Sequence, residues 1–179
     1  DRGGDWSSDV CSSDLEMQVI ILAPTHELVM QIHNEISLLS KNSNSNITSC
    51  PIIGEVNIKR QIEKLKEKPH IIVGSAGRVF ELIKKKKISA HTVKTIVLDE
   101  GDRLLDKSNA PKVKDVIKTT MRDTQILMFS ATISQRTMDI ANVILKNPKV
   151  IKVKASELMN PNISHMYFQC EARDKKIGR

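Results

Sequence analysis

Three acidic residues follow a short apolar run in the middle of the chain, and their order is suited to nucleotide chemistry. Asp99, Glu100 and Asp102 come directly after Ile96–Leu98, and only Gly101 interrupts them. Such a run is typical of a strand buried on both faces of a parallel sheet, whose ligands bind at the carboxyl ends of the strands. A carboxylate there can hold the magnesium ion of a nucleotide, and a second can orient an attacking water.

A structural interpretation of the same residues is also open. Acids after a strand form turns and cap the helix that follows, and a pair of acids alone does not separate this role from a catalytic one. Residues elsewhere in the chain must decide between the two.

Apolar runs alternate with helical stretches along the chain. Strands are predicted at 19–23, 47–53, 70–74, 95–98, 125–129 and 150–153. Helices are predicted to start at the capping residues Thr25, Asn57 and Ser134, and further helices at 76–86 and from 101 to about 121. This alternation predicts an α/β fold, a parallel sheet with helices on both faces. The buried face of the first helix is predicted to carry Leu28, Ile32, Ile36 and Leu39.

The composition favours a polyanionic partner that is held by its backbone. The 179 residues carry a net charge of +7, and the pI is about 9.4. Aromatic residues make up only 3% of the chain, which is few for a protein that stacks on single-stranded bases. The cysteines Cys11, Cys50 and Cys170 form no paired spacing, which predicts a reducing compartment, and we expect a cytoplasmic protein. No apolar run reaches membrane-spanning length, so no membrane partner is expected.

Both ends of the chain look foreign to the rest. Residues 1–15 repeat Ser-Ser-Asp, at 7–9 and 12–14, without helical or strand periodicity. Ser-Ser-Asp and the terminal Ile177–Arg179 can be encoded by opposite strands of one short DNA sequence that resembles a sequencing adapter. We expect residues 1–15 to be a non-native leader, with an ordinary flexible tail as the alternative. Ile177–Arg179 are either native or of the same origin.

Four segments resemble the motifs of DEAD-box RNA helicases, and they occur in the family's order. Pro24–Gln31 resembles motif Ia, Gly74–Arg78 motif Ib, Asp99–Asp102 the Asp-Glu-Ala-Asp box, and Ser130–Thr132 motif III. Each segment is short, but all four follow predicted strands, and the resemblance extends over residues 17–176. It implies the RecA-like fold of P-loop NTPases and an enzyme that couples ATP binding and hydrolysis to RNA binding and duplex unwinding or remodelling.

The resemblance also implies roles for single residues in nucleotide chemistry. Asp99 would bind the magnesium of ATP through water, and Glu100 would position the attacking water. Asp102 would hydrogen-bond Ser130 and Thr132, and so couple the nucleotide state to RNA binding.

A second set of residues is expected to contact the sugar–phosphate backbone of RNA. In the family, motifs Ia and Ib and a Gly-Gly element make such contacts, and in Arg78 we expect charge-assisted hydrogen bonds to phosphate. The candidates in this sequence are Pro24, Thr25, Glu27, Gly54, Ser75, Gly77 and Arg78.

The sequence departs from the family pattern at several positions. Gly101 replaces the alanine of the box, which leaves all three acids in place. His26 stands where motif Ia has arginine, Ser75-Ala76 replace Thr-Pro, and Glu55 replaces the second glycine of the Gly-Gly element. These changes affect the RNA-contacting set more than the nucleotide set.

The phosphate-binding loop and the adenine-reading Q motif are not found in the sequence. Since the family places both before motif Ia, we expect an internal fragment that is inactive by itself. Residues 16–154 would be a partial RecA-like domain without its P-loop strand. Residues 155–179 would be a linker and the first strand, 163–170, of a second such domain. The alternative function is an RNA-binding or regulatory protein derived from a helicase without ATPase activity.

Overall fold

The structure is a computed structural model that describes residues 17–145 and 148–151. In the described part, five strands form one sheet in the order β2-β3-β1-β4-β5, and every neighbouring pair is parallel. The strands are β1 (Val19–Leu22), β2 (Ser49–Ile52), β3 (Ile71–Gly74), β4 (Thr95–Leu98) and β5 (Gln125–Met128). The prediction of a parallel sheet is confirmed.

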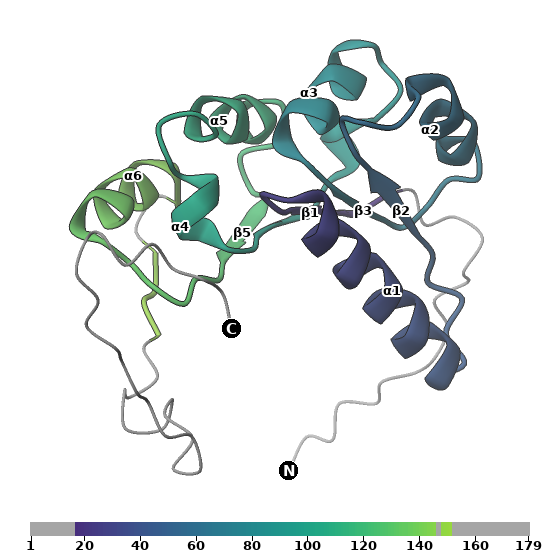
Figure 1. The fold of residues 1–179 in the computed structure, drawn as a ribbon, viewed down its shortest axis with the longest axis horizontal. Helices are drawn as coiled ribbons and strands as arrows, with labels where there is room; N and C mark the ends of the chain where they lie inside the picture. Colours follow the sequence, from purple (N-terminus) through teal and green to yellow (C-terminus); the bar gives the residue numbers. More distant parts are fainter. Residues whose placement is uncertain (1–16, 146–147, 152–179) are drawn as a thin grey trace, which may run out of the picture. The chain divides into compact units, whose positions relative to one another are not determined.

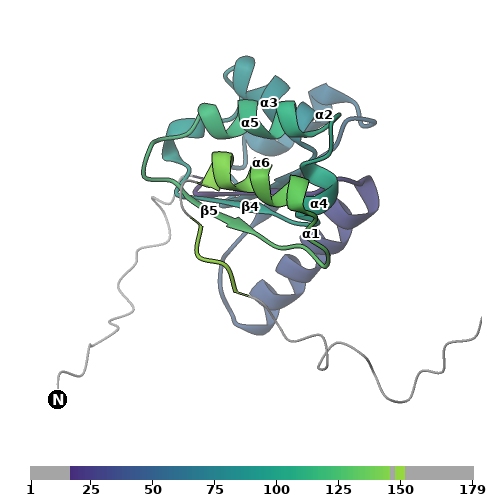
Figure 2. The ribbon, with the colours of Figure 1, turned by 90° about the vertical axis from the view of Figure 1, so that its left-hand side faces the viewer.

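Helices follow the strands along the chain. They are α1 (His26–Asn42), α2 (Ile58–Leu65), α3 (Ala76–Lys84), α4 (Gly101–Leu104), α5 (Ala110–Lys118) and α6 (Gln135–Leu145), with a short 3-10 turn at Ala90–Thr92. In Figures 1 and 2, α1 lies on one face of the sheet, whereas α2, α3, α5 and α6 lie on the other. The predicted covering of both faces is therefore also confirmed. No helix in the described ranges is both long and apolar enough to cross a membrane.

Alternate residues of the strands pack on opposite faces of the sheet. Ile20, Leu22 and Ile96 belong to the larger core, which includes residues of α3, α5 and α6. Ile21 and Val73 pack in a smaller core with residues of α1. The period of two that separates these sets is the side-chain period of a strand, and it explains why the apolar runs read as buried on both sides.

The predicted capping residues start their helices. Thr25 Oγ1 accepts a hydrogen bond from the backbone N–H of Leu28 at 3.2 Å. Asn57 Oδ1 accepts from the N–H of Lys59 at 2.9 Å, and Ser134 Oγ accepts from the N–H of Thr137 at 3.1 Å. Each bond satisfies one N–H that the first turn of a helix leaves free.

The predicted buried face of α1 is wrong at its far end. Leu39 is 58% exposed, whereas Val29, which was not predicted, is fully buried. The helix has 17 residues and is about 25 Å long, but the strands below it have only four residues each. The last turns of α1 therefore extend past the sheet (Figure 1), and periodicity alone cannot reveal where the supporting layer ends.

The strand predicted at 150–153 is not found in the described part of that segment. Val150 and Ile151 belong to no strand, and residues 152 and 153 lie outside the described ranges. The strand predicted at 163–170, the linker and both chain ends also lie outside them. Residues 148–151 belong to a separate compact unit from the sheet.

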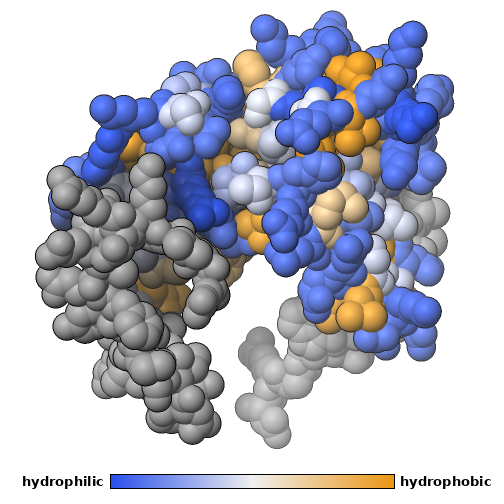
Figure 3. Space-filling view, in the orientation of Figure 1, coloured by the Kyte–Doolittle hydropathy of each residue, from blue (hydrophilic) through white to orange (hydrophobic). Residues whose placement is uncertain are grey.

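Strand β5 is an edge strand within the described sheet, because it pairs only with β4. Leu127 is 37% exposed, and Phe129, directly after the strand, is 58% exposed. The face of the molecule that Figure 3 shows is mainly hydrophilic, with separate hydrophobic patches.

Candidate functional site

Every site residue predicted from the sequence lies at the edge of the sheet where the carboxyl ends of the strands meet. All five strands are parallel, so their carboxyl ends meet there. The order of the strands divides the residues into two neighbouring groups. The loops and helix starts after β2, β3 and β1 carry Pro24, Thr25, Glu27, Gly54, Ser75, Gly77 and Arg78, and those after β4 and β5 carry Asp99, Glu100, Asp102, Ser130 and Thr132.

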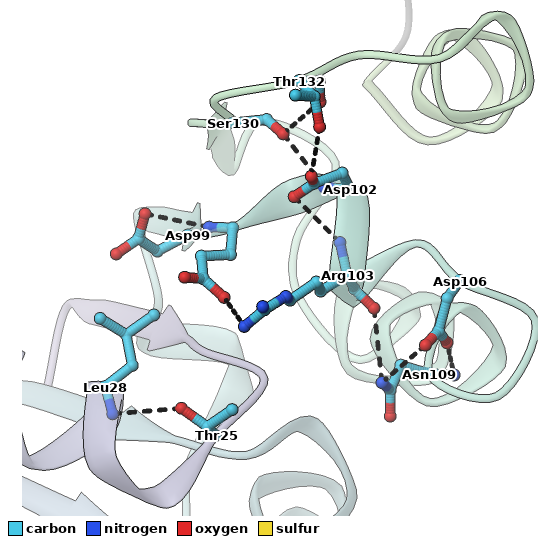
Figure 4. Close-up of polar contacts among 10 residues, drawn as sticks. Thr25, Leu28, Asp99, Asp102, Arg103, Asp106, Asn109, Ser130 and Thr132 are labelled. Carbon is cyan, nitrogen blue, oxygen red and sulfur yellow. Dashed lines mark hydrogen bonds and ion pairs between the residues drawn. The ribbon is translucent and has the colours of Figure 1, made fainter. Parts of the chain in front are cut away.

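The structure brings Asp102, Ser130 and Thr132 together (Figure 4). Thr132 Oγ1 donates a hydrogen bond of 2.6 Å to Asp102 Oδ2, and the backbone N–H of Asp102 donates one of 3.2 Å to Ser130 Oγ. Ser130 Oγ in turn donates to the carbonyl of Thr132 at 2.6 Å. The hydrogen bond from Thr132 lowers the pKa of Asp102, with a further contribution from Ser130, so this carboxylate is held in its charged form.

Asp99 and Glu100 occupy the sharp turn between β4 and α4. The N–H of Glu100 donates to Asp99 Oδ1 at 3.0 Å. Glu100 itself has φ 49° and ψ 55°, a left-handed conformation that is rare for a residue with a side chain. Such strain costs on the order of 1–3 kcal/mol and is concentrated at functional sites.

Two contacts hold Glu100 in this conformation. The N–H of the next residue, Gly101, donates to the carbonyl of Phe129 at 2.9 Å and ties the turn to the end of β5. Arg103 Nη1 lies 2.9 Å from Glu100 Oε2, an ion pair across one helical turn. The carboxylate is therefore oriented from within the chain.

Gly101 is packed so closely that a larger residue would not fit without movement. A Cβ at this position would lie 2.6 Å from Met128 Cγ and 2.8 Å from its Sδ. The departure from the family's alanine is therefore matched by the side chain of Met128, which fills the space.

The donor set around Asp99 fits a magnesium ion that is held mainly by water and phosphate. No cluster of three or more His, Cys, Asp or Glu side chains that could hold a metal occurs among the described residues. Mg²⁺ commonly uses only one or two carboxylates and keeps several waters. Asp99 uses Oδ1 to accept from Glu100, and Oδ2 makes no hydrogen bond to another described residue.

Two of the departures from the family pattern lie next to each other. His26 Nδ1 and Glu55 Oε2 are 3.7 Å apart, and their side chains are 47% and 86% exposed. The contact is an ion pair only when the imidazole carries its second proton. It joins the start of α1 to the loop after β2, within the group predicted to contact RNA.

The guanidinium of Arg78, which the sequence predicted to contact phosphate, is engaged in contacts within its own protein. Its Nη1 donates to the carbonyl of Val56 at 3.0 Å, and its Nη2 donates to the carbonyl of Gly54. Its Nε lies 3.0 Å from Glu81 Oε2, and only 13% of the side chain is exposed. The guanidinium thus faces its own protein on three sides.

Sequence reasoning missed three residues that shape this edge. Arg103 holds Glu100, and its spacing of three residues within a helix was a usable signal. Asp106 accepts hydrogen bonds from the N–H of Asn109 and from Ser108, which lower its pKa and shape the start of α5. Gln61 is 3% exposed and holds the loop after β2. A buried glutamine inside an amphipathic helix cannot be distinguished from an exposed one by its type.

Comparison with known proteins places the chain in a family. The family model described as "DEAD/DEAH box helicase" matches residues 8–140. The chain belongs to this family. This DEAD-box chain is 48% identical, over 158 residues, to a protein of Bacillus subtilis (strain 168) named "Probable ATP-dependent RNA helicase YfmL". It is 45% identical, again over 158 residues, to "DEAD-box ATP-dependent RNA helicase CshC" of Bacillus cereus.

These alignments include 88% of the DEAD-box chain but only 42% of YfmL and 40% of CshC. The chain therefore spans less than half the length of these curated relatives.

Solved structures of DEAD-box proteins have the same fold. A crystal structure of a DEAD box protein from Methanococcus jannaschii superposes with a TM-score of 0.69 and 31% identity, over 75% of this chain and 36% of that one. Yeast Dbp5 bound to RNA and ADP BeF3 superposes with a TM-score of 0.71 and 29% identity, over 83% of this chain and 37% of the other. The predicted RecA-like fold is confirmed.

Proposed function

We propose that the full-length protein is an ATP-dependent RNA helicase and that this chain supplies part of its first RecA-like domain. The observation that carries the proposal is the division of one sheet edge into two groups. Acids and hydroxyls follow β4 and β5, whereas Gly54, Gly77 and the starts of three helices follow β2, β3 and β1. The first group suits hydrolysis of the phosphate chain of a nucleotide, and the second suits contacts with the sugar–phosphate backbone of RNA. Because the groups are neighbours, the nucleotide state can change RNA affinity.

In the nucleotide half, each acid has its own task. Asp99 would hold Mg²⁺ through water, and the ion, when bound, neutralises charge on the transferred phosphate. Glu100, already turned and held by Arg103 at 2.9 Å, would orient and polarise the attacking water. Asp102 would transmit the nucleotide state through Ser130 and Thr132, to which it is hydrogen-bonded.

In the RNA half, two glycines support close approach of another molecule. Nothing lies within 4 Å of the place where a Cβ on Gly54 would be, and nothing but the Lys112 side chain, at 3.5 Å or more, approaches the Cβ place on Gly77. Neither has a positive φ. Packing and backbone conformation therefore do not require glycine at these positions, whereas a backbone bound at close range would.

The remaining RNA candidates would surround these glycines. Thr25 and Ser75 offer hydroxyl groups, and Pro24 and Glu27 flank Thr25 and the first turn of α1. The net charge of +7 favours RNA in general. The low aromatic content favours contacts with sugar and phosphate over stacking on bases.

Nucleotide-dependent RNA binding tests this proposal. In the full-length protein, labelled single-stranded RNA should bind more tightly with a non-hydrolysable ATP analogue and magnesium than without nucleotide. Asp99→Asn should abolish this difference, because the carboxylate that holds the ion is lost. Asp123→Asn is the matched control, since this exposed acid precedes β5 at the opposite edge of the sheet. Equal RNA affinity with and without nucleotide would favour the alternative, an RNA-binding or regulatory protein without ATPase activity.

A further inference from the structure

We propose that Arg78 is a positioning residue for RNA binding: it fixes the loop of residues 53–57, between β2 and α2, and does not itself contact phosphate. The inference rests on the proposed RNA-binding function and changes the role of this arginine within it. We call residues 53–57 the β2–α2 loop.

The guanidinium of Arg78 holds the β2–α2 loop by its carbonyl groups. Nη1 donates to the carbonyl of Val56 at 3.0 Å and Nη2 donates to that of Gly54, so one planar group spans both ends of a three-residue segment. The planar fork of arginine is suited to such a two-point contact, and a lysine ammonium is not.

A second side chain holds the same loop from within the protein. Gln61 Nε2 donates to the carbonyl of Ile53 at 2.7 Å and lies 3.5 Å from that of Val56. Gln61 is 3% exposed, and its Oε1 has no hydrogen-bond partner in the described part of the chain. An unsatisfied buried acceptor destabilises the folded state. The amide is thus turned toward the loop even though its oxygen is left without a donor.

Arg78 is itself held in place by charge. Its Nε lies 3.0 Å from Glu81 Oε2, and the other oxygen of Glu81 lies 2.8 Å from Lys85 Nζ. The hydrogen bond from Lys85 lowers the pKa of Glu81, which keeps the carboxylate charged. With its side chain only 13% exposed, Arg78 would have to give up this ion pair to reach a bound phosphate.

The consequence is a loop in which three carbonyl acceptors are occupied and two backbone donors are free. The carbonyls of Ile53, Gly54 and Val56 are all hydrogen-bonded inside the domain. The backbone N–H groups of Gly54 and Glu55 make no hydrogen bond to any described residue. Free amides on a fixed loop are suitable donors for phosphate oxygens. Arg78 would therefore act on RNA through the geometry of these amides.

The salt dependence of RNA binding separates positioning from direct contact. Each cation that neutralises a phosphate on a single strand adds about 0.7 to the slope of log K against log salt. A positioning arginine adds nothing to that slope. In the full-length protein with nucleotide bound, Arg78→Gln should weaken RNA binding by about five- to ten-fold at all salt concentrations, as loss of one or two hydrogen bonds would. The slope should not change.

Two further variants sharpen the test. Gln61→Leu removes no charge but releases the loop from its other side, so it should weaken binding in the same way. Arg78→Lys keeps the charge but cannot span both carbonyls, and it should behave like Arg78→Gln. Arg122→Gln is the matched control, because this exposed arginine precedes β5 at the opposite edge of the sheet and should change nothing.

Two other measurements separate loop positioning from general damage. With saturating RNA, ATP turnover of Arg78→Gln should equal that of the wild type, while the RNA concentration for half-maximal stimulation rises. Amide hydrogen exchange should accelerate in residues 53–57 and stay unchanged in β1 and β4.

The inference is overturned if Arg78→Gln lowers the slope by about 0.7 while Arg78→Lys and Gln61→Leu bind like the wild type. It is also overturned if Arg78→Gln leaves RNA affinity unchanged. Failure of the wild-type protein to bind RNA would instead refute the proposed function. In that case, unchanged hydrogen exchange in residues 53–57 of Arg78→Gln would refute the loop-holding role separately.

Discussion

At the scale of single residues, the carboxylates of the box are each held differently. Asp102 accepts from Thr132, Glu100 is held by Arg103, and Asp99 accepts only from the backbone of the next residue. Asp99 therefore keeps the most capacity for an external ligand, and Asp102 the least. This difference follows from the contacts alone and agrees with the three roles proposed above.

The first prediction concerns the pKa of Asp102. Because the folded-state pKa lies below the unfolded value, the stabilising contact is fully present above the ordinary aspartate pKa and is lost as the pH falls through the lowered one. Thr132→Val removes the largest contribution, so it should raise the pKa of Asp102 toward its ordinary value. Ser130→Ala should raise it less. A carbon-13 titration of the Asp102 carboxyl measures both, and an unchanged value in Thr132→Val would contradict the assigned cause.

The second prediction concerns the packing of Gly101 against Met128. A Cβ at Gly101 would lie 2.6 Å from Met128 Cγ, so Gly101→Ala should destabilise the domain by about 1–3 kcal/mol. In a Met128→Ala background the same change should be neutral or should stabilise by up to about 1 kcal/mol, because alanine favours helix over glycine. Urea unfolding of the four proteins of this cycle measures the coupling. Equal effects in both backgrounds would show that the two residues do not compete for space.

The third prediction concerns the contact between His26 and Glu55. His26→Arg places a permanent charge in the group of residues that we propose contacts RNA, but Glu55 lies 3.7 Å from His26 and would pair with the new arginine. We therefore expect modest tightening of RNA binding in His26→Arg and greater tightening in His26→Arg combined with Glu55→Gly. The matched control is Glu35→Gln, a change of the same charge about 13 Å further along α1. RNA titrations at low salt provide the measurement, and additive single effects would argue against pairing.

At the scale of elements, the five strands of the sheet and the helix starts after Thr25, Asn57 and Ser134 could be predicted from the sequence because their signals are local. Period, apolar runs and capping residues such as Thr25 depend on neighbours within one turn. The exposure of Leu39 depends on where the sheet below α1 ends, and the left-handed Glu100 depends on a hydrogen bond from Gly101 to Phe129. The hydrogen bonds from Arg78 reach carbonyl groups that are 22 and 24 positions away in the sequence. Contacts of that kind have no sequence period that could predict them.

The fourth prediction concerns the edge strand β5. Leu127 is partly exposed on a strand with a single partner in the described sheet, and such edges template aggregation. The chain expressed alone should therefore aggregate and unfold in a low, broad transition. Leu127→Lys should raise its monomer fraction in sedimentation, whereas Leu38→Lys, the same change at a 51% exposed position on α1, should not. If both variants raised the monomer fraction equally, the gain would be due to net charge alone.

At the scale of the whole molecule, one sheet edge carries both groups of site residues in strand order. The fold and the family could be predicted from four motifs that follow predicted strands, because a parallel sheet brings all carboxyl ends together. The sequence could not predict which residues contact RNA and which hold the loops that contact it, as we propose for Arg78. The residue type, arginine, is the same in both roles.

The central claim is that the full-length protein hydrolyses ATP in response to RNA and that Glu100 orients the water. Phosphate release with and without RNA, measured for the wild type, Glu100→Gln and the control Glu35→Gln, tests it most directly. We predict RNA-stimulated turnover in the wild type and the control, and a loss on the order of a hundred-fold or more in Glu100→Gln, with ATP-dependent RNA binding retained. Turnover of Glu100→Gln near that of the wild type, or a wild type that RNA does not stimulate, would contradict the claim.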